Sequence, residues 1–82
     1  MIQQYLKAAM RHAQYEVIEE DGTFYGHIPE CPGAWANEAT LEGCRDELES
    51  VLEDWILIGI ARHQHIPEID GISLNVPIAE HA

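Results

Sequence analysis

Basic residues are scarce in this sequence. Its 82 residues contain four lysines and arginines against 15 aspartates and glutamates, a formal net charge of -11 at pH 7. Nucleic acids and anionic membranes attract proteins through clusters of lysine and arginine, so this charge balance argues against both as direct partners. A basic protein is the complementary partner.

Long apolar runs and cysteines are also lacking. No stretch approaches the roughly 20 apolar residues that a membrane span requires, and the N-terminus lacks the pattern of a secretory signal. Cys31 and Cys44 are the only cysteines, too few for a disulfide framework. The hydrophobic content of 46% nevertheless predicts a folded chain. We therefore expect a folded cytoplasmic protein with reduced thiols.

The length predicts one small domain that spans residues 1–82. A core of this size is marginal by itself, so association would add stability. We expect a homo-oligomer, either a dimer or a tetramer.

Two segments have the apolar spacing of amphipathic helices. Residues 1–14 form the first, and the second begins near Leu41 with Thr40 as its N-cap. Residues 55–61 are apolar all round this second helix, more than one sheet face can cover. The first helix, a second copy of the chain or a partner protein could each cover them. We assign an oligomer interface to Trp55, Ile56, Ile58 and Ile60.

Alternating residues typical of strands lie between the two helices. Residues 15–20 and 23–28 flank Asp21-Gly22, a dipeptide typical of hairpin turns with positive φ. Residues 34–37 form a third short strand after the turn at Pro32-Gly33.

A final strand is expected at residues 72–76, beyond the turn at Asp70-Gly71. The order is therefore α-β-β-β-α-β. This is an α+β class with a small, mainly antiparallel sheet covered by one long helix. The core spans residues 15–76, and residues 77–82 are a tail.

The residues that could perform chemistry do not form a catalytic constellation. His63 and His65 lack further metal ligands at a familiar spacing. Cys44 lies in the apolar stripe of the second helix and is interpreted as core, whereas Cys31 lies in a turn, where we expect more exposure but identify no activating base. We therefore predict no catalytic residue, no metal, no cofactor and no enzymatic activity.

A series of motifs resembles the HicB-like antitoxin family over about residues 15–76. The motifs are Tyr15-x-Val17, Asp21-Gly22, an aromatic second strand, Pro29-Glu30-x-Pro32-Gly33 and Thr40-Leu41-Glu42. The resemblance implies a truncated RNase H-like fold that lacks the active site of that enzyme, with residues 1–14 as an added helix. It also implies that the protein occludes a small basic HicA-like toxin that cleaves messenger RNA.

The sequence departs from this family at two places. Gly43-Cys44 stands where Glu-Ala is usual, a change that weakens the first helical turn. The chain also stops six residues after Val76, where many members carry a DNA-binding module, so we expect no direct operator binding.

Five acids are assigned to toxin binding through electrostatic attraction. They are Glu30, Glu38, Asp46, Glu49 and Glu53. Solubility is the alternative role for any one of them. Two other functions remain open: an orphan homo-oligomeric structural or regulatory protein without a toxin, and a metal-dependent RNase H-like nuclease. The expected last strand carries no acid, which argues against the nuclease.

Overall fold

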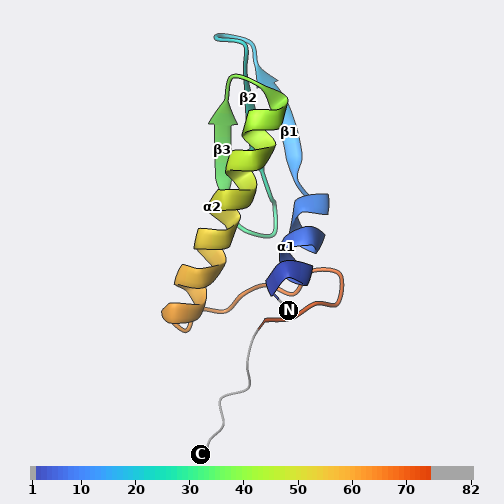
Figure 1. Ribbon diagram of the computed structural model, residues 1–82, viewed down its shortest axis with the longest axis vertical. Coiled ribbons are helices and arrows are strands. Elements are labelled where there is room, and N and C mark those ends of the chain that lie inside the picture. The colour runs from blue at the N-terminus through green and yellow to red at the C-terminus, as the bar shows by residue number, and fades with distance from the viewer. Residues whose placement is uncertain (1, 75–82) are drawn as a thin grey trace, which may run out of the picture.

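The computed structural model describes residues 2–74 of the chain. Figure 1 shows a small α+β fold in which one long helix lies across a three-stranded antiparallel sheet. The predicted fold class is confirmed by this arrangement. The elements in order are α1 (Ile2–Arg11), β1 (Gln14–Ile18), β2 (Thr23–His27), β3 (Trp35–Glu38) and α2 (Leu41–Ala61).

The sheet presents one face to α2. Strand β2 lies between β1 and β3, with Gly26 opposite both Tyr15 and Ala36. Gly26 approaches α2 so closely that a β-carbon there would lie 3.1 Å from Cys44 Sγ. Because side chains alternate along a strand, Tyr25, His27 and Trp35 lie on the opposite face.

The core follows one stripe of α2. Its fully or nearly fully buried residues recur at steps of three or four, as an amphipathic helix requires. They are Cys44, Leu48, Leu52, Ile56 and Gly59. The expectation that Cys44 packs in the core is confirmed.

Helix α1 packs against the same chain. Tyr5, Ala8 and Ala9 are completely buried, and the Tyr5 hydroxyl donates to the carbonyl of Pro67 at 2.5 Å. In Figure 1, α1 lies beside the C-terminal half of α2, and the segment after α2 passes beneath it. The first helix therefore packs against α2 of its own chain.

The β1–β2 hairpin differs from the predicted two-residue turn. Its loop is the four residues 19–22, and Ile18 pairs with Thr23. Only Gly22 has positive φ (71°), and its N–H donates to the carbonyl of Ile18 at 2.8 Å. The carboxylate of Asp21 instead accepts from Thr23 N and Oγ1, a local Asx arrangement that replaces the positive φ expected there.

The start of α2 agrees with the sequence. Thr40 is the N-cap, and its Oγ1 accepts from Gly43 N at 2.9 Å. A β-carbon at position 43 would lie 2.9 Å from the same oxygen, so glycine suits this close cap.

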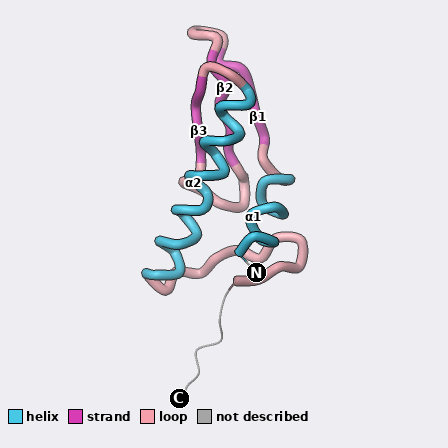
Figure 2. The backbone as a smooth tube through the Cα atoms, in the orientation of Figure 1, coloured by secondary structure: helices cyan, strands magenta, loops and turns pink. Residues whose placement is uncertain are grey.

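The final strand expected at residues 72–76 does not extend the sheet as far as Leu74 (Figure 2). Ile72 instead exchanges two backbone hydrogen bonds with Ile69, at 2.8 and 3.1 Å. Asp70 and Gly71 between them have positive φ (52° and 79°), the geometry of a type I′ turn. The rest of that prediction, with the tail, falls on residues 75–82, outside the described part.

Candidate protein-binding surfaces

The five acids assigned to partner binding lie in separate places. Asp46, Glu49 and Glu53 are exposed along α2, and Glu38 is exposed at the end of β3. Glu30 lies in the loop after β2 and is engaged by His12. The structure therefore does not bring the five together, and their role in binding stays a prediction.

An acidic groove runs between β3 and α2. We define it by Trp35, Asn37, Glu38, Glu47 and Val51, which line it without any basic residue. Glu47 was not assigned from the sequence, because only the packing of α2 beside β3 brings it to Glu38. The groove follows the outer edge of β3, which pairs only with β2 within residues 2–74.

Aromatic side chains lie on the sheet face that α2 leaves uncovered. Tyr25 stacks on His27 with ring centroids 5.5 Å apart, and Trp35 lies 6.1 Å from Tyr25. Trp35 is 54% exposed at the edge strand. Because Tyr25 and His27 are two residues apart on one strand, the sequence alone could have placed them on one face of the sheet. It could not have shown which face α2 leaves uncovered.

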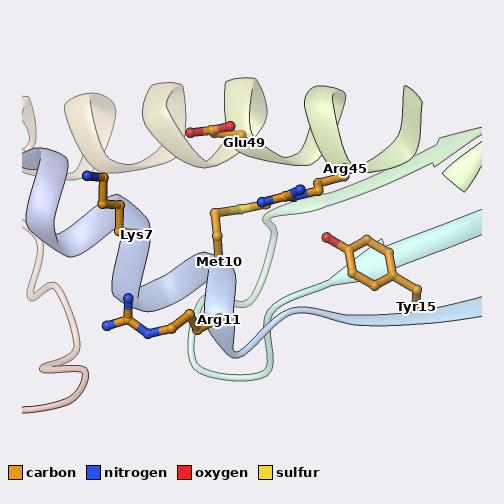
Figure 3. Close-up of a pocket in the computed structure, with 6 residues that line it drawn as sticks. All are labelled: Lys7, Met10, Arg11, Tyr15, Arg45 and Glu49. Atoms are coloured by element: carbon orange, nitrogen blue, oxygen red, sulfur yellow. The ribbon is translucent and has the colours of Figure 1, made fainter. Parts of the chain in front are cut away.

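A basic groove lies on the other side of α2 (Figure 3). Three of the four basic residues of the chain line it, two from α1 and one from α2, more than 30 residues further along the sequence. The groove is lined by Lys7, Met10 and Arg11 of α1, Tyr15 of β1, and Arg45 and Glu49 of α2. Burial raises the pKa of Tyr15, and the positive charge of Arg45 opposes this shift. Sequence reasoning missed this groove.

The apolar end of α2 is only partly exposed. Ile56 is completely buried in the core, so it cannot belong to a surface of the folded chain. Trp55 is half-buried, and its Nε1 donates to the carbonyl of Pro32 at 3.0 Å. Ile58 (49%) and Ile60 (40%) are exposed, together with Leu57 (48%). An oligomer interface, which stays a prediction, would therefore use these three residues.

His12 connects the end of α1 to two loops through hydrogen bonds from both nitrogens of its ring. Its Nδ1 lies 2.8 Å from Glu30 Oε2 in the loop after β2, and its Nε2 lies 2.9 Å from Asp70 Oδ1 beyond α2. Arg11 adds a longer contact of 3.7 Å to Asp70. Hydrogen bonds to Asp70 and then Glu30 raise the pKa of His12, because both carboxylates favour the protonated ring.

This raised pKa predicts a stability that depends on pH. The contribution of His12 is fully present below its unfolded pKa, near 6.5, and is lost as pH rises through the higher folded pKa. We therefore expect His12→Asn to destabilise the protein more at pH 6 than at pH 9, as measured by urea unfolding. His65→Asn is the matched control because His65 is exposed. Equal losses at both pH values for His12→Asn would contradict the role of the two carboxylates.

Both cysteines are buried free thiols. The expected exposure of Cys31 is wrong: the loop that carries it folds under α1, and its Sγ lies 3.9 Å from the buried Tyr5 hydroxyl. Burial raises the pKa of both thiols, which disfavours the reactive thiolate. Neither cysteine therefore gains the activation that a nucleophile needs.

The described residues offer no group of three histidine, cysteine or carboxylate side chains placed to share a metal ion. His63 and His65 are exposed at the end of α2. His63 has positive φ (57°), and the next N–H, that of Gln64, donates to the carbonyl of Gly59 at 2.8 Å. His63 therefore occupies the helix-ending position that glycine usually takes. Neither helix within residues 2–74 is both long and apolar enough to cross a membrane.

Together these features define a small α+β protein in which one helix covers a three-stranded sheet between two grooves of opposite charge. The chain belongs to the UPF0150-like family, whose model matches residues 4–67. It is also similar to the solved structure of TTHA0281 from Thermus thermophilus, at 36% identity and a TM-score of 0.83 over 93% of this chain and 94% of that one. No curated protein matches the sequence.

Proposed function

We propose that this protein is a noncatalytic antitoxin-type binding protein that occludes a small basic HicA-like toxin. The observation that carries the proposal is the acidic groove beside the outer edge of β3, which pairs with no strand beyond β2 within residues 2–74. Membership of the UPF0150-like family supports the HicB-like resemblance of residues 15–76. The proposal places the protein in the cytoplasm, where such a toxin would cleave messenger RNA.

The charge distribution favours a basic partner at this groove. Lys7, Arg11 and Arg45 are collected on the opposite side of α2, so Glu38 and Glu47 face solvent without a basic neighbour in the groove lining. Complementary charge speeds association and selects the partner more than it adds affinity. The acids on the outer face of α2, including Asp46 and Glu53, extend the same field.

The strand edge and Trp35 supply the contacts that charge alone does not. The outer edge of β3 presents backbone donors and acceptors to which an extended segment of a partner could pair. Trp35, 54% exposed on this strand, has the size and polarity of residues that dominate binding energy in protein interfaces. A toxin bound here would have its basic surface covered.

The test is to look for a small basic protein encoded by a reading frame adjacent to this gene and to co-express it with this chain, followed by pull-down and a growth assay. We expect a stoichiometric complex that restores growth. In the double variant Glu38→Lys/Glu47→Lys we expect about a hundredfold weaker affinity, because reversing two contacts removes attraction and adds repulsion. The matched control is Glu19→Lys/Glu20→Lys, which makes the same charge change in the exposed β1–β2 loop.

The outcomes test two claims separately: that the protein is an antitoxin, and that the toxin binds at the acidic groove. Equal weakening in the two double variants would mean that net charge acts without contact at the groove. Failure of the wild-type chain to bind or neutralise the basic protein would overturn the antitoxin proposal.

A second candidate is an orphan homo-oligomer, which the exposed apolar residues Leu57, Ile58 and Ile60 favour. Light scattering of the chain alone distinguishes it: a stable homo-oligomer without a toxin partner would support the orphan.

A further inference from the structure

We propose that the basic groove binds a phosphate monoester of a small organic molecule. The groove collects three of the four basic residues of a chain that carries 15 acids. Lys7 and Arg11 reach it from α1 and Arg45 from α2, so the site exists only because the two helices pack side by side (Figure 3).

Two of these cations, Lys7 and Arg45, are not used in ion pairs that hold the described part of the fold together. Within residues 2–74, Lys7 and Arg45 form no ion pair shorter than 4.0 Å, and Arg11 has one contact, at 3.7 Å to Asp70. The charges of Lys7 and Arg45 are therefore free to meet a ligand, and the longer contact of Arg11 leaves its guanidinium able to take part.

The charge of the groove matches a phosphate monoester. Lys7, Arg11 and Arg45 against the one carboxylate of Glu49 give the lining a formal charge of +2. A phosphate monoester carries about -1.5 to -2 near pH 7 and has three strong acceptor oxygens. A single arginine guanidinium can donate two parallel hydrogen bonds to two such oxygens. A monocarboxylate would leave positive charge uncompensated.

The size and lining of the groove require an organic body on the ligand. Its volume is about 400 Å³, within the range of sites for small molecules. Met10 and the ring of Tyr15 line it between the charged groups, and sulfur and aromatic faces pack well against a flat apolar ligand.

The net negative charge of the chain does not prevent this binding at physiological salt. Charges more than about 8 Å away are largely screened at 0.15 M ionic strength. The local lining then sets the potential that the ligand meets. We expect binding to survive at this salt concentration, since the acids outside the groove repel less.

The experiment is an NMR titration of the full chain with phenyl phosphate, read from the backbone amides. We expect saturable shifts at Lys7, Tyr15 and Arg45. Arg45→Gln should weaken binding about tenfold, the effect of losing one charge-assisted hydrogen bond. Arg62→Gln is the matched control, because it removes the same charge outside the groove lining and should leave the affinity unchanged.

Inorganic phosphate and phenylacetate complete the test. We expect both to bind more weakly than phenyl phosphate and to shift the same amides. Equal affinity of inorganic phosphate and phenyl phosphate would overturn the organic ligand. Absence of saturable shifts with phenyl phosphate, or equal weakening by Arg45→Gln and Arg62→Gln, would overturn the site. None of these results bears on toxin binding, which is assigned to the groove on the opposite side of α2.

Discussion

Leu52→Ala is expected to lower the free energy of unfolding by about 2–5 kcal/mol. Leu52 is completely buried in the middle of α2, where the helix covers the sheet. Removing its side chain loses buried apolar surface and leaves a cavity that packed neighbours fill only in part. A domain of this length has about 4–12 kcal/mol of stability in total. The loss should therefore be a large fraction of it, visible in urea unfolding as a lower midpoint.

Leu57→Ala is the matched control for this prediction. It makes the same substitution on the same helix, but Leu57 is 48% exposed. We expect it to cost less than about 1 kcal/mol in a monomer, as surface substitutions do. If Leu57, Ile58 and Ile60 form an oligomer interface, its cost should instead grow with protein concentration. Equal costs for Leu52→Ala and Leu57→Ala at low concentration would contradict the assignment of the core stripe.

The elements that local sequence controls were predictable. Apolar spacing of three and four residues marks both helices, and Thr40 specifies the start of α2 because its hydroxyl caps the first turn. Alternation identified three strands to within a residue or two. These patterns act between near neighbours in the chain, so a sequence shows them directly.

Two kinds of feature were not predictable: the choice between competing local hydrogen bonds in a turn, and burial by an element distant in sequence. Asp21-Gly22 and Asp70-Gly71 are the same dipeptide, yet only the second has positive φ at both residues. Thr23 supplies Asp21 with two hydrogen bonds that change the turn. Cys31 was expected to be more exposed because it lies in a turn, but its side chain is completely buried and its Sγ lies 3.9 Å from the Tyr5 hydroxyl of α1, 26 residues away.

The candidate sites divide in the same way. The abundance of acids follows from composition, and their general attraction for a basic partner needs no structure. The positions at which the charges come together, however, can be known only from the structure. Glu38 and Glu47 line the same groove only because α2 packs beside β3, and Lys7 and Arg45 line the same groove only because α1 packs beside α2. Positions far apart in sequence give no periodic signal that could have paired them.

Gly26→Ala is expected to destabilise the protein by about 1–3 kcal/mol, the usual cost of overpacking a core. A β-carbon at position 26 would lie 2.8 Å from two ring carbons of Tyr15 and 3.1 Å from Cys44 Sγ. Both distances are shorter than ordinary van der Waals contact. Alanine also suits a strand better than glycine does, which offsets part of the cost. Urea unfolding of the two proteins measures the difference.

Measuring Gly26→Ala in a protein that also carries Tyr15→Ala tests whether a clash with the Tyr15 ring causes the loss of stability. Truncating the ring by itself removes packing, but it also removes the atoms that the new methyl group would strike. We therefore expect Gly26→Ala to cost less in the Tyr15→Ala protein than in the wild type, with a coupling of about 1 kcal/mol for residues in contact. The clash with Cys44 Sγ remains in both backgrounds, so some cost should persist. If the cost is the same in both, the Tyr15 ring moves aside freely, and the close approach of Gly26 to α2 alone explains why glycine occupies this position.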